Sequence, residues 1–173
     1  MSREKPIVLL MCSKHKRSFV CPANEMYISE RFQQSLKLAR LITDNDDRRI
    51  LILSAKHNVL QLNDEIEPYN IDLAKMKPKT QINWGRKTAK MLSDWGDLDD
   101  NAFLLLTNST YHNAIISHLN HYTSYLNMLE ESYHADYLNK YISSFKMPLP
   151  KPIMKDGNMV NMNRPNDIII QYT

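Results

Sequence analysis

Residues 6–11 read PIVLLM, and the polar run CSKHKR (residues 12–17) follows them directly. A continuous apolar run of this length predicts a short strand covered on both faces, because a strand with one wet face alternates apolar and polar residues. Two later segments share the pattern, RILILS (49–54) and AFLLLT (102–107). We therefore predict three buried strands, each followed by polar residues.

The segments between these predicted strands have apolar residues at helical spacing. Phe32, Leu36, Ala39 and Leu41 keep the spacing of a predicted helix over residues 29–43, and residues 80–94 form a second amphipathic pattern. A third helix is predicted from Tyr111 to about Leu119. Strands that alternate with helices are typical of parallel βαβ units with right-handed crossovers. The predicted fold is α/β: a three-layer α/β/α sandwich around a mainly parallel central sheet.

Two regions lack this alternation. Residues 57–78 show no sustained period and are predicted to form a long ordered loop, of a length that is often functional. We expect residues 1–125 to form the α/β core domain with the active site, and residues 126–173 to pack on it as a C-terminal helical segment with a Pro/Asn-rich tail. The end of that tail, DIIIQYT, suits either an edge strand or a docking segment. Five tyrosines near this region are spaced as on one helix face, which predicts core packing or a homodimer contact: Tyr122, Tyr125, Tyr133, Tyr137 and Tyr141.

Composition excludes several classes of protein. The chain has 173 residues, 43% of them hydrophobic and 24% charged, as in an ordinary globular domain. Its two cysteines predict reduced thiols and a cytoplasmic protein, and no apolar run is long enough to span a membrane. With only three glycines the chain has neither a P-loop nor a G-x-G-x-x-G turn. The net charge of +3 permits a nucleic acid or nucleotide partner, and the spacing of His, Cys and acidic residues predicts no metal and no cofactor.

The polar residues that follow the three strands are the main candidates for a site. Ligands of open α/β sheets bind outside the carboxyl ends of the strands. Residues 12–17, 54–57 and 108–111 follow the three predicted strands. We therefore expect these three segments to build one pocket.

Cys12 lies near several cations and a predicted helix N-terminus, which would stabilise a thiolate for nucleophilic attack. The alternative is a small buried residue at a strand end. Ser13, Lys14 and Lys16 are candidates to hold a phosphate or carboxylate, and a solvated charged loop is the alternative for the lysines.

Ser54, Lys56 and His57 repeat the arrangement after the second strand, and we favour binding over nucleophilic attack there. In the run EIEPYN, Glu67 is a candidate general acid or base, with Glu65 as a competitor. Tyr69 could stack on a base or sugar. The alternative is a rigid turn with a solvated Glu67.

The motifs CSKHK, CPANEMY, LSAKH, EIEPYN and LLTNSTY together resemble an uncharacterised family, the domain-of-unknown-function family 6884. That family reads C-S-x-x-K, P-A-x-x-x-Y-x-S-x-x-F, L-S-A-K-x-G-L-[LV] and I-x-P-Y-[DN], and then has a strand ending near a tyrosine. The resemblance covers about residues 6–120. The matching positions are Cys12, Ser13, Lys16, Pro22, Ala23, Tyr27, Ser29, Phe32, Ser54, Ala55, Lys56, Ile66, Pro68, Tyr69 and Tyr111.

Two positions depart from the family pattern. Asn58 replaces the usual glycine, although asparagine also tolerates a left-handed backbone. Asn70 replaces the usual acid after Pro-Tyr, so a catalytic role of that acid would be lost or altered in this chain.

More distantly, the family resembles the uracil-DNA-glycosylase-like sandwich, domains attached to tRNA deazaguanine-modifying enzymes, and the peroxide-stress YaaA group. These relatives handle nucleobases, nucleosides or DNA. The resemblance thus implies an enzyme acting on a nucleobase or nucleotide at an N-glycosidic bond, with modified DNA as one substrate. The alternatives are a non-catalytic DNA-binding or nucleotide-sensing protein and a thiol enzyme that uses Cys12.

The glycosylase hypothesis assigns a role to each group of candidates. Lys14, Lys16 and Lys56 would hold phosphate, while Tyr27 and Tyr69 would frame the base. Glu67 or Asn108 would assist departure of the base or attack on the sugar. Ser13, Ser54, His57 and Tyr111 would complete the binding site.

Overall fold

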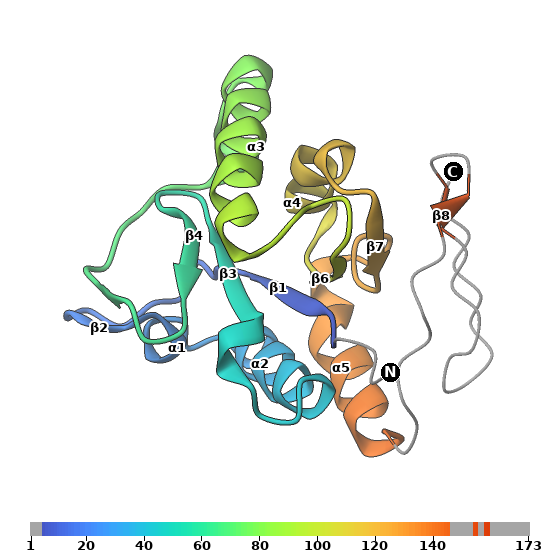
Figure 1. Ribbon diagram of the computed structural model, residues 1–173. Coiled ribbons are helices and arrows are strands. Elements are labelled where there is room, and N and C mark those ends of the chain that lie inside the picture. The colour runs from blue at the N-terminus through green and yellow to red at the C-terminus, as the bar shows by residue number, and fades with distance from the viewer. Residues whose placement is uncertain (1–4, 146–153, 156–157, 160–173) are drawn as a thin grey trace.

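The computed structural model describes residues 5–145, together with residues 154–155 and 158–159 (Figure 1). A five-stranded sheet forms its centre in the order β4-β3-β1-β6-β7. Strands β3, β1, β6 and β7 run parallel, and only β4 of this sheet is antiparallel to its neighbour. The sheet strands are β1 (Ile7–Met11), β3 (Ile50–Ser54), β4 (Asn58–Gln61), β6 (Ala102–Leu106) and β7 (His121–Ser124).

The three apolar runs form the three central strands, as predicted. All five residues of β1 and of β3 are buried. In the register of the sheet, Leu9 of β1 lies between Leu51 of β3 and Leu105 of β6. A strand that is apolar along its whole length needs cover on both faces, and this requirement selects the layered fold.

Helices supply that cover from both sides, which confirms the three-layer α/β arrangement (Figure 1). Helices α2 (Glu30–Ile42) and α5 (His134–Ser143) pack together on one face, and α3 (Pro78–Leu92) and α4 (Ser109–Ile115) pack together on the other. The predicted start of α2 is confirmed, because the Ser29 hydroxyl caps it by accepting the Phe32 N–H at 3.2 Å. Phe32, Leu36 and Ala39 are buried, whereas Leu41 lies on the opposite side of the helix and is 40% exposed, so including it in the apolar face was wrong. The remaining elements are short: β2 (Cys21–Pro22), α1 (Ala23–Met26), β5 (Glu65–Ile66), β8 (Met154–Lys155), β9 (Asn158–Met159), and the 3-10 turns η1 (Asp47–Arg49), η2 (Leu73–Lys75), η3 (Ser93–Trp95), η4 (Ile116–His118) and η5 (Glu131–Tyr133).

The prediction of a continuous loop over residues 57–78 is wrong in part. The chain turns tightly after β3 and returns as the antiparallel strand β4, and β5 then pairs with β2. Asn58 makes the turn possible with a φ of 62°, in the left-handed region that asparagine tolerates. With only four residues, β4 is too short for a period to show in the sequence.

The prediction of a single tyrosine-lined helix face is also wrong. Tyr122 lies in β7, a short strand that the sequence analysis missed, and Tyr125 directly follows it. Tyr141 of α5 lies 5.5 Å from Tyr125 and 6.3 Å from Tyr137 between ring centroids, so these rings pack within the chain. Tyr133 remains 60% exposed. The homodimer contact stays a prediction, and the DIIIQYT segment lies outside the described residues.

Within the described part of the chain, no helix has the length and apolar character that crossing a membrane requires.

Asn58 allows a test of the tight turn after β3. Its amide donates to Thr88 Oγ1 at 2.9 Å and to the Trp84 carbonyl at 3.3 Å. Asn58→Gly keeps the backbone conformation and loses only these bonds, whereas Asn58→Ala also places a side chain without a polar group in the left-handed region. We expect Asn58→Ala to lower the free energy of urea unfolding by about 1 kcal/mol more than Asn58→Gly. Equal losses would show that the backbone conformation contributes nothing.

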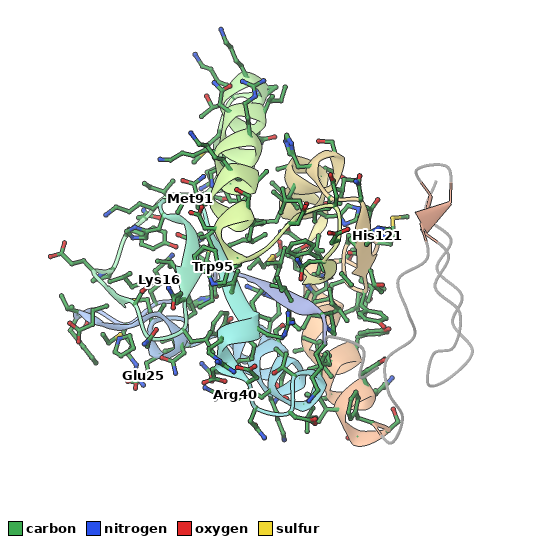
Figure 2. The ribbon with its side chains drawn as sticks, viewed as in Figure 1. Lys16, Glu25, Arg40, Met91, Trp95 and His121 are labelled. Carbon is green, nitrogen blue, oxygen red and sulfur yellow. The ribbon has the colours of Figure 1, made fainter. Side chains whose placement is uncertain are left out.

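His112 predicts a pH dependence of stability. Burial lowers the pKa of His112 to about 4, and its Nδ1 contacts Ser124 Oγ at 3.1 Å. Because the unfolded chain takes up this proton near pH 6.5, stability is lost as the pH falls from about 6.5 to about 4, by roughly 3 kcal/mol in total. His112→Gln should flatten the unfolding free energy over this range. His121→Gln, which changes an exposed histidine of β7 (Figure 2), is the control and should leave the slope unchanged.

Candidate functional site

The site lies at the carboxyl ends of the central strands. The chain leaves β1 toward α2 on one face of the sheet and leaves the adjacent strand β6 toward α4 on the other (Figure 1). Ligands of open α/β sheets bind where neighbouring strands diverge in this way. Cys12 follows β1 and Tyr111 lies in α4, and their side chains meet across this point with Sγ and Oη 3.0 Å apart.

Three hydroxyl groups form a continuous chain beside this pair. Tyr27 Oη lies 2.7 Å from Tyr69 Oη, which in turn lies 2.7 Å from Ser54 Oγ. Ser54 Oγ accepts the backbone N–H groups of His57 at 3.1 Å and Lys56 at 3.3 Å. Since these two bonds occupy its lone pairs, the Ser54 hydroxyl donates its proton to Tyr69.

Two lysines lie over the ring of Tyr69. Lys16 Nζ is 4.4 Å from the Tyr69 ring centroid and 5.8 Å from that of Tyr27. Lys56 Nζ is 5.8 Å from the Tyr69 ring. Burial lowers the pKa of Lys16, and the neighbouring Cys12 opposes this shift. The two ammonium groups therefore come from two different strand-end loops and converge on one aromatic ring. The face of the Tyr69 ring attracts cations and so stabilises both lysines in these positions.

The tyrosines of the site are neutral hydrogen-bond donors. Burial, followed by the proximity of Cys12, raises the pKa values of Tyr27, Tyr69 and Tyr111. Their hydroxyls consequently keep their protons at neutral pH. The site thus combines uncharged O–H groups with two ammonium groups, which suits a ligand that carries both polar ring atoms and negative charge.

Arg31 is a site residue that the sequence analysis missed. Its Nη2 donates to the Cys12 carbonyl at 2.8 Å, while its Nη1 is buried without a hydrogen-bond partner among the described residues. Burial lowers the pKa of Arg31, and the proximity of Glu131 and Cys12 opposes the shift. An arginine in the first turn of a helix was the available signal, because acidic residues are favoured there.

Asn108, a predicted catalytic residue, caps α4. Its Oδ1 accepts the Tyr111 N–H at 3.2 Å, and its Nδ2 donates to the carboxylate of Glu131. Both polar atoms of the amide are therefore engaged in holding the start of α4 and thereby Tyr111.

The other predicted site residues differ in burial and in whether they contact the hydroxyl chain around Tyr69. Ser13 is buried next to Cys12, whereas Lys14 and Glu67 are exposed. Glu67 makes no side-chain hydrogen bond or ion pair within the part of the chain that the structure describes. The ring of Tyr27 is fully buried and packs 5.0 Å from Phe32, so its contribution passes through its hydroxyl to Tyr69. His57 lies edge-on to Tyr69, with 5.4 Å between the ring centroids.

Asp72 brings a carboxylate that the sequence analysis did not consider. Its Oδ1 accepts the Ala74 N–H at 3.0 Å and caps η2. It is also close enough to Lys16 and Tyr111 to raise the pKa of both groups, although burial is the larger influence on each. Asp72 lies two residues beyond Asn70, where the resemblance leads one to expect an acid.

Among the described residues, no three His, Cys, Asp or Glu side chains gather closely enough to hold a metal ion.

Residues 7–147 match the model of a protein family described as Family of unknown function (DUF6884). The chain belongs to this family. The match confirms the resemblance seen in the motifs and extends beyond residue 120 to include β7 and α5. No curated protein matches the chain.

The DUF6884 motifs come together in the structure. Six positions that carry the resemblance belong to the cluster at the strand ends, and we call this cluster the strand-end site: Cys12, Lys16, Tyr27, Ser54, Tyr69 and Tyr111. They come from five separate motifs, so the fold unites residues that are up to 99 positions apart.

The central position of Tyr69 predicts a stability cost when its hydroxyl is removed. Tyr69→Phe leaves the hydroxyls of the buried residues Ser54 and Tyr27 without their shared partner, and we expect a loss of about 1–3 kcal/mol in the free energy of urea unfolding. Tyr133→Phe removes the same group from an exposed tyrosine and should cost less than about 0.5 kcal/mol. Similar losses in both variants would contradict the hydroxyl chain.

Proposed function

We propose that the protein binds a nucleotide, or a nucleotide unit of DNA, at the strand-end site and acts on its N-glycosidic bond as a glycosylase or glycosyl transferase. One observation carries this proposal: the Lys16 and Lys56 ammonium groups converge on Tyr69, whose hydroxyl continues into the Ser54 and Tyr27 hydroxyls. The cations suit a phosphate, the half-buried ring suits a base, and the hydroxyls suit its polar edge. The three-layer fold with a site at the strand ends also supports the distant likeness to the uracil-DNA-glycosylase-like sandwich.

The reaction would break the bond between C1′ of the sugar and a base nitrogen. Water or an incoming base forms the new bond at C1′, and the departing base takes up a proton. Tyr111 and Tyr69 are suitable hydrogen-bond donors to the departing base because their hydroxyls remain protonated. The proton that the base takes up is the one that the attacking water or incoming base loses. Glu67 is a candidate base for the attack, and Asp72 is a second candidate because of its proximity to Lys16 and Tyr111.

Binding without turnover is the alternative, and two observations favour it. The Asn108 amide is engaged in capping α4, and Asn70 stands where the family usually has an acid, so a catalytic role of that acid would be lost or altered. In this alternative the same site serves a DNA-binding or nucleotide-sensing protein. Both cysteines are free, which supports a cytoplasmic location for either function.

Release of free base from nucleic acid or nucleotides tests the proposal. Purified protein would be incubated with unmodified DNA, with DNA carrying hypermodified bases and with a nucleotide mixture, and released bases quantified by mass spectrometry. We expect release from at least one substrate, and we expect Lys16→Met to slow it by at least about tenfold through loss of phosphate binding. Lys140→Met, on the exposed side of α5, is the matched control and should retain the rate.

Cys12→Ser separates this reaction from thiol catalysis. The buried Cys12 thiol bonds to Tyr111, and a serine hydroxyl can keep that bond, so turnover should persist in the variant. Complete loss of turnover in a folded Cys12→Ser protein would support a nucleophilic thiol instead. Ligand binding without base release would support the alternative, and absence of both would overturn the proposal.

A further inference from the structure

The segment 73–93, which contains α3, has an unusual charge. It carries six lysines and arginines and no aspartate or glutamate: the cations are Lys75, Lys77, Lys79, Arg86, Lys87 and Lys90. All six are exposed. Within the described residues none of them forms an ion pair, since the ion pairs found there involve other side chains.

The four cations within α3 occupy one side of the helix. At 100° per residue, Lys79, Arg86, Lys87 and Lys90 fall within an arc of about 100°, and they extend about 16 Å along the helix axis. The buried residues of α3, such as Trp84 and Thr88, lie on the opposite side. We call these four cations the α3 stripe.

An ordinary solvated helix face would look different. Such faces mix both signs of charge, because pairs of opposite charge three or four residues apart stabilise a helix and like charges destabilise it. In the α3 stripe, Arg86 and Lys90 are like charges four residues apart, and Lys87 and Lys90 are like charges three residues apart. Neighbouring cations without compensating acids therefore carry a small cost in stability, which a polyanionic partner would remove.

We infer that the α3 stripe binds the phosphodiester backbone of a nucleic acid and thereby presents it to the strand-end site. This inference deepens the proposed function, and it makes a polynucleotide rather than a free nucleotide the substrate. A row of cations about 16 Å long matches a polyanion that carries charges at intervals of a few ångströms. Lysine and arginine contacts to phosphate position such a partner without reading its sequence.

The stripe and the strand-end site are rigidly connected. Trp84 of α3 donates its indole N–H to the Ser54 carbonyl at 3.1 Å, and its ring lies 5.5 Å from that of Tyr111. Gly85 brings α3 against α4, because a Cβ at this position would lie 1.9 Å from the Ala114 carbonyl oxygen. A backbone held on α3 is thus fixed relative to Ser54 and Tyr111.

A groove beside α3 offers further polar contacts. It has a volume of about 370 Å³ and lies between η2, α3 and α4, lined on the α4 side by Ser109, Thr110 and Asn113. Hydroxyl and amide groups of this kind commonly contact phosphate and sugar oxygens. Figure 2 shows α3 standing out from the body of the protein, with many nitrogen-tipped side chains around it.

Nucleic acid fits the stripe better than a membrane surface does. A helix that binds in the plane of a membrane needs an exposed apolar face, and the apolar face of α3 is buried against the sheet. Ile82 is the exposed large hydrophobic residue of α3, at 59%. A single isoleucine adds little apolar area for insertion between lipids.

The salt dependence of binding tests the inference. Fluorescence anisotropy would give the Kd between 50 and 200 mM NaCl for three labelled probes, each with strands of 30 nucleotides: duplex DNA, single-stranded DNA and duplex RNA. We expect Lys87→Gln/Lys90→Gln to weaken binding to the preferred probe and to make the slope of log K against log[NaCl] less steep. The change should be about 1.8 for duplex DNA and about 1.4 for single-stranded DNA, since each lost phosphate contact contributes about 0.9 or about 0.7.

The matched control removes two cations from other surfaces. Lys37→Gln/Lys140→Gln changes the net charge equally, at exposed positions of α2 and α5 in the opposite helical layer. This control should keep the slope of the unaltered protein. Equal slopes in the two double variants would overturn the inference, as would failure to bind all three probes. Binding to phosphatidylserine vesicles in preference to every nucleic acid probe would also overturn it.

The design separates this inference from the proposed function. If the stripe variants alter binding but no base is ever released, the backbone contact stands and the glycosylase reaction fails. If base is released from free nucleotides and the stripe variants leave polynucleotide binding unchanged, the reaction stands and the stripe assignment fails.

Discussion

The hydroxyl of Ser54 accepts two backbone N–H groups and donates to Tyr69, while the carbonyl of the same residue accepts the indole N–H of Trp84. One residue at the end of a central strand therefore connects the β3–β4 turn, the loop that carries Tyr69, and α3. All these groups are wholly or partly buried, so each bond replaces one that water can no longer make. The position of Tyr69, and through it the convergence of Lys16 and Lys56, depends on this arrangement.

The same hydrogen bonds connect the strand-end site to the positively charged surface of α3. Helix α3 is held at the middle of its buried face, at Trp84 and Thr88, by Ser54 and Asn58, and its opposite face carries the α3 stripe. A ligand that engages both the stripe and the strand-end site would span a rigid unit and would need no closing segment. This geometry suits a polymer whose backbone is gripped outside the site while one unit enters it. For such a protein, affinity would depend on salt, and selectivity on the hydroxyls around Tyr69.

Much of the architecture could be predicted from local patterns. The apolar runs of β1, β3 and β6 predict buried strands, and the spacing of Phe32, Leu36 and Ala39 predicts the buried face of α2. The convergence of Cys12, Ser54 and Tyr111 followed from the rule for strand ends. The strands β4 and β7 were missed because each has only four residues, too few for a period to show. Their pairing depends on neighbours that are distant in sequence or on a turn that Asn58 permits.

By itself, the sequence determined the layered α/β fold, the family, and the set of residues at the strand ends, since these depend on apolar periodicity and on motif spacing. Only the tertiary structure decided how those residues act together. It buried the Tyr27 ring and left its hydroxyl as a support for Tyr69, it committed Asn108 to capping α4, and it brought Arg31 and Asp72 to the site. The reason is that hydrogen-bond partners and burial arise from contacts between distant segments, which no local pattern records.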